Sequence, residues 1–349
     1  MNRLESLEQC DYVRDILAQP EAVERTLALL EQLRLPEDLA AGPRAGRIRR
    51  VVLTGMGASF HALYPVHLRL GSCGVASQIV ETSELVHYQA ALLEPDTLVV
   101  AVSQSGRSAE ILRLLEATAG RVTLVGISNS PDSPLAEHCA FTLTTQAGKE
   151  SSVSTKTYVA TLAALEWLGA ALTGVNTNDA LASVATAISP MREYLSRWNE
   201  HVELLVRWLS PVRHIFLCGR GPSLATAWEG ALVLKEAAHF PAEGMGSAEF
   251  RHGPLDMVEP GILVCIFAGE NRTRELNQRL ATDVNEAGGM SAWIGPESGL
   301  EACRIPELLG MARPLVEILP VQMMSLALAV RSGREPGRFT RLSKVTAIE

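Results

Sequence analysis

A cluster of hydroxyl side chains stands at residues 103–108, where the sequence reads SQSGRS directly after an apolar run. Ser103, Ser105 and Ser108 supply hydroxyl donors, and a helix that starts here would add unpaired backbone N–H groups. A helix N-terminus carries partial positive charge, and Gly106 would let the backbone approach a ligand closely. The segment therefore indicates a phosphate-binding loop. A serine-rich helix cap without a ligand is the alternative interpretation.

A second set of reactive side chains follows a predicted helix that breaks near Pro241. Glu229, Val233 and Glu236 share one face of this helix, because seven residues make about two turns. A loop rich in small residues then leads to His252. A carboxylate on a helix and a histidine in a nearby loop form a plausible acid–base set. The alternatives are an ordinary solvated helix carboxylate and a surface-loop histidine.

The segments that must position these side chains recur along the chain. VVLTGMGASFHA at residues 51–62 and IFLCGRGPSLAT at 215–226 are both a strand-like run, then Gly-x-Gly-x-Ser, then a helix start. LVVAVSQSGRS at 98–108 falls in the same way against LVCIFAGENRT at 263–273. The offset between the copies stays near 164 residues. We interpret this pattern as two copies of one domain.

Each copy alternates short apolar runs with helix-length segments, which predicts an α/β fold with a doubly wound parallel sheet and helices on both faces. Ligands of such sheets bind beyond the carboxyl ends of the strands, where the serine loop is expected to lie. The predicted organisation is an N-terminal helical segment, a first domain, a helical linker, a second domain and a C-terminal tail. Their boundaries are 1–34, 35–175, 176–204, 205–340 and 341–349.

The second copy does not keep the serines. The positions that match Ser103 and Ser105 carry Ala268 and Glu270, and a carboxylate there would repel a phosphate. If the serines were only helix caps favoured by the fold, the second copy would be expected to retain them. We therefore expect the first copy to bind the anion and the second to supply other groups.

Composition limits the function classes. The chain has 349 residues, of which 47% are hydrophobic, so it is long enough for two globular domains. Its net charge of −8 argues against nucleic acid or an anionic membrane as the main partner. Six scattered cysteines and eight histidines show no metal-ligand spacing, so we expect no metal and no other cofactor.

The sequence also bears on localisation. Its first residues, MNRLESLEQC, contain no apolar signal region. The most apolar helical stretch, around Leu168–Val175, is too short to span a bilayer. We therefore expect a cytoplasmic protein.

Several motifs together resemble the SIS (sugar isomerase) domain family, in particular the double-SIS isomerase half of glucosamine-6-phosphate synthase. The motifs are GMGASF, SQSGRS, GKESSVSTKT, GRGPSLATAWEGALVLKE, AEFRHGPL and RLSKVTAIE, and they cover most of the chain in the family's order. The resemblance implies two tandem SIS domains that act on a sugar 6-phosphate. It also implies a homodimer with shared active sites, in which the histidine reaches the partner's site.

The resemblance assigns roles to individual residues. The implied phosphate-binding residues are Ser59, Ser103, Gln104, Ser105 and Ser108. The implied sugar-binding residues are Gly57, Ser152, Ser154 and Glu229. The implied catalytic residues are Glu236, which transfers the proton between C1 and C2, His252, which opens the sugar ring, and Lys344, in the tail that enters the active site.

Three departures from the synthase pattern shape the expected function. We expect no glutaminase domain with a leading cysteine, because the first cysteine of this sequence is Cys10. Val233 stands where the synthase helix has a lysine, and the segment around Ser152–Ser154 is one residue shorter. We therefore do not expect glutamine-dependent aminotransfer. We expect a phosphosugar isomerase, with a fructosamine-6-phosphate deglycase or aminosugar-phosphate deaminase as the alternative. A sugar-phosphate-binding regulator ranks below both.

Overall fold

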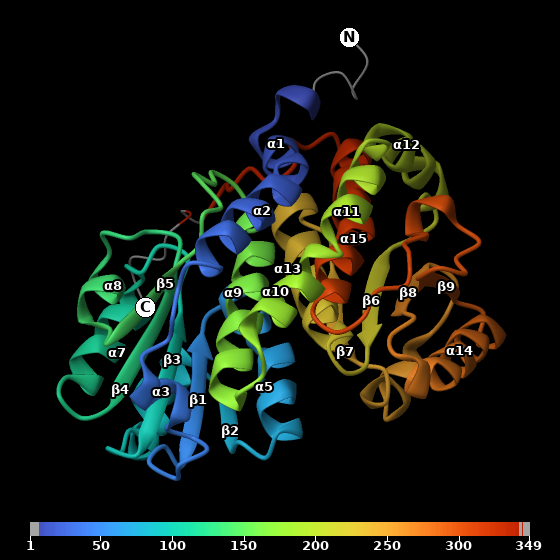
Figure 1. Cartoon of the computed structure of the whole chain (residues 1–349). Coiled ribbons are helices and arrows are strands. Elements are labelled where there is room, and N and C mark those ends of the chain that lie inside the picture. The colour runs from blue at the N-terminus through green and yellow to red at the C-terminus, as the bar shows by residue number, and fades with distance from the viewer. Residues whose placement is uncertain (1–6, 342–343, 345–349) are drawn as a thin grey trace. The chain divides into compact units, whose positions relative to one another are not determined.

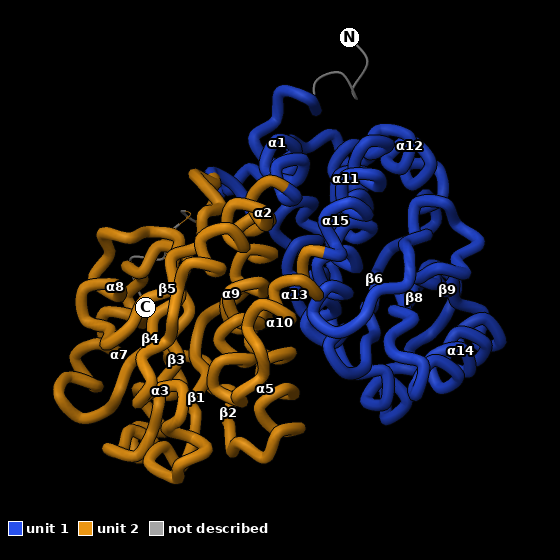
Figure 2. Tube along the Cα trace, viewed as in Figure 1, with its two compact units in different colours: residues 1–20, 151–153, 186–340 blue, residues 21–150, 154–185, 341–349 orange. Residues whose placement is uncertain are grey.

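The computed structural model describes residues 7–341 and 344, which divide into two compact units (Figure 2). Among these residues, unit 1 contains 7–20, 151–153 and 186–340. Unit 2 contains 21–150, 154–185, 341 and 344. Each unit is built around its own parallel sheet.

The sheet of unit 2 has five parallel strands in the order β2-β1-β3-β4-β5 (Figure 1). Every residue of the central strand β3 is buried, as expected for a strand that is covered by helices on both faces. The strands are β1 (Arg50–Gly55), β2 (Ser77–Glu81), β3 (Thr97–Val102), β4 (Thr123–Ser128) and β5 (Phe141–Thr144).

Helices cover both faces of this sheet. On one face, α6, α7 and α8 enclose an apolar cluster that includes Val99, Ala101 and Leu114, while α5 and α9 pack together on the other. The helices of unit 2 are α3 (Glu37–Ala41), α4 (Ala58–His61), α5 (Leu63–Ser72), α6 (Thr82–Tyr88), α7 (Ala109–Thr118), α8 (Pro134–His138), α9 (Lys156–Thr173) and α10 (Thr177–Ala185), with the 3₁₀ turn η2 (Ala90–Leu92). Helix α2 (Gln19–Leu30) begins in the last residues of the first segment of unit 1 and continues into unit 2.

The sheet of unit 1 has four parallel strands in the order β7-β6-β8-β9, the same order as the first four strands of the other sheet. Its strands are β6 (His214–Gly219), β7 (Ala242–Gly246), β8 (Ile262–Phe267) and β9 (Met290–Ile294). Gly55 and Gly219, which the sequence comparison paired, each end the strand second from the edge of their sheet. The prediction of an α/β fold with two parallel sheets is confirmed.

Helices α13 and α15 pack against each other in unit 1, and α14 lies against an apolar cluster that includes Phe216, Phe250 and Val264. The helices are α1 (Asp11–Leu17), α11 (Ile188–Leu195), α12 (Trp198–Trp208), α13 (Ser223–Ala238), α14 (Asn271–Glu286) and α15 (Ala312–Ser332). The 3₁₀ turns are η1 (Leu7–Gln9), η3 (Glu249–Arg251), η4 (Pro254–Met257) and η5 (Glu301–Cys303). Helix α13 ends at Ala238, because His239 adopts a left-handed conformation with φ of 53°.

Helix α15 is a long apolar helix that the sequence reading did not single out. Its 21 residues are long and apolar enough to cross a membrane by length and composition, whereas Leu168–Val175 is only the end of α9 and the turn after it. However, 83% of the most apolar window of α15 is buried inside the protein. Its packing against α11, α12 and α13 accounts for the apolar composition.

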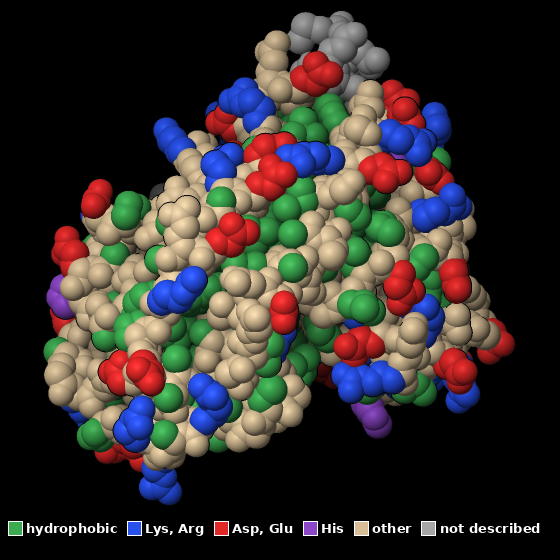
Figure 3. Space-filling view, viewed as in Figure 1, with side chains coloured by type: hydrophobic (Ala, Val, Ile, Leu, Met, Phe, Trp, Pro, Cys, Tyr) green, Lys and Arg blue, Asp and Glu red, His purple; other side chains and the backbone are tan. Residues whose placement is uncertain are grey.

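Charged side chains are dispersed over the face of the molecule drawn in Figure 3. Lysine and arginine side chains lie among aspartate and glutamate side chains there, rather than in a separate basic area. Surface ion pairs such as Arg197–Glu200 and Arg213–Glu259 reflect the same mixture.

Candidate functional site

The serine loop joins β3 to α7 at the carboxyl end of the sheet in unit 2. Gly106 has φ of +62°, and a Cβ atom there would lie 2.6 Å from the Cβ of Ser133, so this turn requires glycine. The N–H of Gly106 donates to Ser103 Oγ at 3.1 Å, and the N–H of Arg107 donates to Ser105 Oγ at 3.2 Å. Two backbone N–H groups before α7 therefore bond to hydroxyl oxygens within the loop.

The hydroxyl groups of the loop remain available as donors. Ser103 and Ser105 use their oxygens as acceptors, so each keeps its proton for a second partner. Ser108 is the N-cap residue of α7, but its side chain makes no capping hydrogen bond. By contrast, Ser133 caps α8 by accepting from the N–H of Ala136 at 3.3 Å. Helix capping therefore explains Ser133 but not the side chain of Ser108.

A small pocket of about 120 Å³ gathers all five predicted phosphate-binding residues. It is lined by Met56, Ser59, Val102, Ser103, Gln104, Ser105, Ser108, Ile111 and Lys344. Pockets that enclose a whole small molecule usually measure roughly 300–1,000 Å³. The size and the hydroxyl lining suit one phosphate-sized group. Gly57, with φ of +51°, lies between Met56 and Ser59 at the start of α4.

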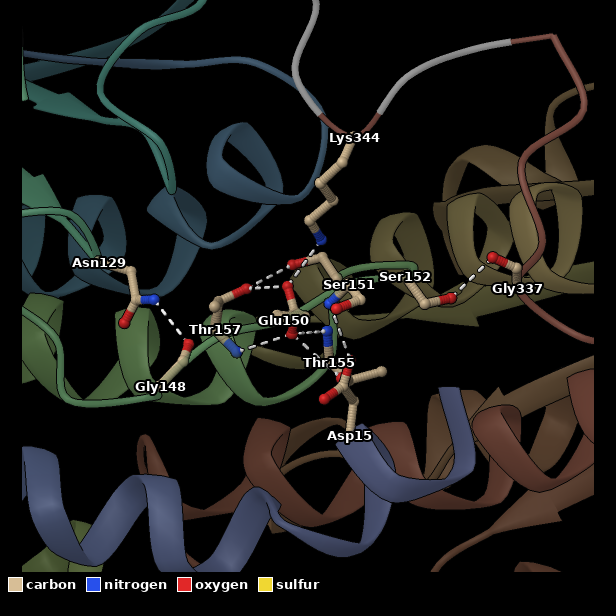
Figure 4. A network of polar contacts seen from close by, with 11 residues as sticks. Asp15, Asn129, Gly148, Glu150, Ser151, Ser152, Thr155, Thr157, Gly337 and Lys344 are labelled. Atoms are coloured by element: carbon tan, nitrogen blue, oxygen red, sulfur yellow. Dashed lines mark hydrogen bonds and ion pairs between the residues drawn. The ribbon is translucent and has the colours of Figure 1, made fainter. Parts of the chain in front are cut away.

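Lys344 brings a cation to this pocket. Its Nζ atom lies 2.8 Å from Oε2 of Glu150, and its side chain is 24% exposed (Figure 4). The Glu150 side chain is completely buried. It also accepts hydrogen bonds from the N–H and Oγ1 of both Thr155 and Thr157, at 2.6 to 3.1 Å. These four bonds fix the carboxylate that holds the lysine beside the serine loop.

The sequence reading did not assign a role to Glu150. It lies in the motif GKESSVSTKT, where a single carboxylate precedes a run of serines and threonines. A buried acid needs several donors, and hydroxyl residues close by in the sequence are a source of them. That composition was the available signal.

Two predicted sugar-binding serines follow Glu150. The hydroxyl of Ser152 donates to the carbonyl oxygen of Gly337 at 2.7 Å, and the residue is 5% exposed. The hydroxyl of Ser154 lies 3.1 Å from Oγ1 of Thr157. Neither serine lines the pocket that holds the serine loop. Their contact with a sugar stays a prediction.

The predicted base Glu236 and the predicted sugar-binding residue Glu229 both lie on α13 in unit 1. Glu229 and Val233 are buried, and Glu236 is half-buried in the last turn of the helix. The contact of Glu229 with a sugar stays a prediction. The hydroxyl of Tyr12 in α1 is 3.0 Å from Ser325 Oγ. Burial raises the pKa of Tyr12, and the Glu236 and Glu229 carboxylates raise it further, so this hydroxyl stays protonated beside the acidic face of α13.

His252 directly follows the turn η3, which begins three residues after β7. Its N–H donates to the carbonyl of Glu249 at 2.8 Å, and the residue is exposed to solvent. The exposed ring is free of the core packing that would fix a buried histidine. Its predicted service to a partner's active site stays a prediction.

The matched loop of unit 1 has a different chemistry. Ser223, the counterpart of Ser59, is buried and donates to Glu317 Oε1 at 2.8 Å. A Cβ placed on Gly221 would lie 3.7 Å from Oε2 of Glu270, so an acidic side chain occupies the vicinity of this turn. The Ser223 hydroxyl is bonded to Glu317, and the Glu270 carboxylate lies near the turn. This part of unit 1 therefore lacks the hydroxyl-lined surroundings of the phosphate-sized pocket in unit 2.

Comparison with known protein families identifies the fold. The SIS domain profile matches residues 47–171 and 208–309, one region in each half of the chain. The chain belongs to the SIS domain family. The two matched regions contain the two parallel sheets, so the prediction of two tandem SIS domains is confirmed.

Individual relatives agree with this assignment. Glutamine–fructose-6-phosphate aminotransferase of Pyrococcus horikoshii is 31% identical over 314 residues, which cover 86% of this chain and 52% of the relative. The chain thus spans about half the length of the curated relatives it matches.

Two solved structures show the same fold. The C-terminal domain of glucosamine-fructose-6-phosphate aminotransferase from Francisella tularensis has a TM-score of 0.79 at 22% identity, over 97% of this chain and 98% of that one. Tagatose-6-phosphate ketose/aldose isomerase from Escherichia coli has a TM-score of 0.81 at 20% identity, over 94% and 96% of the two chains.

Proposed function

We propose that this SIS protein is an enzyme that binds the 6-phosphate of a hexose or aminohexose in the pocket of the serine loop. One observation carries the proposal: four serines, Gln104 and Lys344 line the same phosphate-sized pocket. Hydroxyl donors and a lysine point charge are a common means of binding phosphate. The equivalent loop of unit 1 lacks this set.

The proposed reaction is an aldose–ketose isomerisation by 1,2 proton transfer. A base removes the proton from C2 of the open-chain aldose while the C1 oxygen takes up a proton, which gives an enediol. Protonation at C1 and loss of the proton from the C2 hydroxyl then give the ketose, so no further reactant is needed. We assign this step to Glu236, because a single carboxylate can serve both neighbouring carbons. We assign ring opening to His252, which would exchange a proton with the ring oxygen.

The phosphate would serve binding and positioning rather than bond making. It is remote from C1 and C2 of a hexose, so contacts to it hold the reactive end of the substrate without taking part in the chemistry. Under this proposal the enzyme is a homodimer in which His252 serves the partner's active site.

A deglycase or deaminase is the second candidate, because it would use the same phosphate pocket and the same acid–base residues. Glutamine-dependent aminotransfer is not proposed, because the apolar and fully buried Val233 stands where the resemblance to the synthase places a lysine. Loss of that cation separates this chain from the synthase pattern at the helix that carries Glu236. In the deglycase and deaminase reactions water enters, the C–N bond breaks, and ammonia or an amine leaves.

A panel of hexose and aminohexose 6-phosphates would test the proposal. Ligand binding is followed by thermal shift, isomer formation by chromatography, and amine release by a coupled ammonia assay. Isomer formation without amine release supports the isomerase, and amine release supports the alternative. Binding without any turnover would favour a sugar-phosphate-binding regulator. If no 6-phosphate shifts the melting temperature, the proposed ligand class is wrong.

A further inference from the structure

The segment that follows α15 is buried at one point before it reaches Lys344. Helix α15 ends at Ser332, and residues 333–335 are exposed. Pro336 and Gly337 are buried, and Arg338 is exposed again. The chain therefore enters the interior of unit 1 only briefly in this segment.

Both backbone polar groups of Gly337 are hydrogen-bonded. Its N–H donates to the carbonyl oxygen of Ala237 at 3.1 Å, in the last turn of α13. Its own carbonyl accepts the Ser152 hydroxyl at 2.7 Å. The preceding carbonyl, of Pro336, accepts from the Cys10 thiol at 3.3 Å. Three parts of unit 1 thus hold two consecutive residues.

The packing of Ser152 and Tyr12 around Gly337 leaves no room for a side chain at this position. Gly337 has φ of +72°, and a Cβ there would lie 2.9 Å from Cβ of Tyr12 and would collide with Oγ of Ser152. Because the nearest neighbours include the main body of a buried tyrosine, they cannot move aside easily. Only glycine fits this position.

The loop that holds Gly337 also holds Lys344. Ser152 bonds Gly337, and Glu150, two residues earlier, bonds Lys344 (Figure 4). The hydroxyl proton of Ser152 is engaged by the carbonyl oxygen of Gly337, which gives this serine a structural role in the segment after α15.

We propose that Ser152 and Gly337 are positioning residues that fix the C-terminal segment so that Lys344 pairs with Glu150 beside the phosphate pocket. The part of this inference that concerns phosphate binding by Lys344 rests on the proposed function. Its structural part, the anchoring of Lys344, can be measured without any substrate.

Two glycine substitutions provide a matched comparison. Gly337→Ala adds a methyl group into the contact with Ser152 and Tyr12. Gly333→Ala is the control, because Gly333 has φ of +68° and nothing lies within 4 Å of its added Cβ. The two variants therefore carry the same backbone strain, and they differ in the collision alone. Ser152→Ala removes the hydrogen bond without adding volume.

Lysine acylation reads out the position of Lys344 directly. The sequence contains four lysines, and Lys149 and Lys235 are exposed enough to serve as internal references. After brief treatment with an acetylating reagent, mass spectrometry gives the modification of Lys344 relative to Lys149. We expect a several-fold rise for Gly337→Ala, a smaller rise for Ser152→Ala, and no change for Gly333→Ala.

Calorimetric binding of inorganic phosphate separates the inference from the proposed function. Faster acylation together with a several-fold weaker phosphate Kd supports both. Faster acylation with an unchanged Kd supports the anchor and contradicts the proposed role of Lys344 in phosphate binding. Unchanged acylation in both Gly337→Ala and Ser152→Ala overturns the inference, whatever the phosphate affinity.

Discussion

Lys344 Nζ lies 2.8 Å from Oε2 of Glu150, and these two residues are 194 positions apart in the sequence. The lysine side chain is one-quarter exposed, whereas the carboxylate is completely buried. A buried carboxylate needs partners, and here two threonines and one lysine provide them. The pair therefore links the stability of unit 2 to the location of the cation beside the phosphate pocket.

Replacement of this carboxylate should destabilise the protein. Glu150→Gln keeps the shape of the side chain but turns an NH₂ group toward the Lys344 ammonium or toward the threonine donors. We expect a loss of about 1–3 kcal/mol, because buried polar groups lose their partners. Urea unfolding measures it, with the exposed Glu116→Gln in the same unit as control. Equal unfolding midpoints for the two variants would contradict the prediction.

Introduction of a carboxylate into the serine loop should abolish phosphate binding. Ser105→Glu reproduces the residue that unit 1 carries at the matched position and places a negative charge against the ligand. We expect a loss of inorganic phosphate affinity of at least tenfold with an unchanged fold. The control Gln32→Glu adds the same charge at an exposed site outside the pocket. If Ser105→Glu binds phosphate as tightly as the control, the anion site is elsewhere.

Much of this arrangement follows from local sequence. The apolar runs that end at Gly55, Gly219 and Val102 are strands, because each run is short, contains β-branched or aromatic residues and ends at a turn signal. The position of the serine loop could also be predicted, because the loop directly follows the apolar run that ends at Val102. Its hydroxyl groups could be predicted from residue types alone.

Other features depend on contacts that no local pattern records. Ser152 and Gly337 meet across 185 residues, and the need for glycine arises only from the side chains packed around it. The partners of the Gly106 and Arg107 N–H groups could not be predicted either, because the nearby hydroxyls of Ser103 and Ser105 compete with any other acceptor for them. The apolar sequence of α15 has the length and composition of a membrane span, and only its burial, which the sequence does not record, distinguishes it from one.

Removal of the proposed base should reduce turnover and spare binding. Glu236→Gln keeps the size of the side chain, so the substrate should bind with a similar KM while kcat falls by roughly 10²–10⁴-fold. Lys235→Gln, at the exposed neighbouring position of α13, is the control. Steady-state kinetics on the 6-phosphate found in the panel provides the measurement. A kcat equal to that of the control would exclude Glu236 as the base.

The buried carboxylate of Glu317 should make stability depend on pH. Burial raises its pKa to about 7, although Arg313 and the hydroxyls of Ser223 and Thr226 oppose the shift. The folded protein therefore holds this proton between the unfolded value of 4.5 and about pH 7, where the unfolded chain has lost it. The stability that the protonated acid contributes is full below pH 4.5 and is lost as the pH rises through 7.

The neutral variant Glu317→Gln removes this titration. We expect the stability of the wild-type protein, relative to that of the variant, to fall between pH 5 and pH 8 in urea unfolding. Glu116→Gln, whose carboxylate is exposed on α7, serves as the control and should follow the wild type at both pH values. A constant difference between wild type and Glu317→Gln would show that Glu317 titrates normally.

Mixed dimers would test whether His252 serves the partner's active site. Glu236→Ala and His252→Ala should each be inactive alone. In a mixed dimer with shared sites, one site receives the intact Glu236 of one chain and the intact His252 of the other, while the second site carries both lesions. Random pairing makes about half of the dimers mixed, so roughly a quarter of wild-type activity should return. If both residues serve the same chain, verified mixed dimers will remain inactive, because every site then contains one of the two lesions.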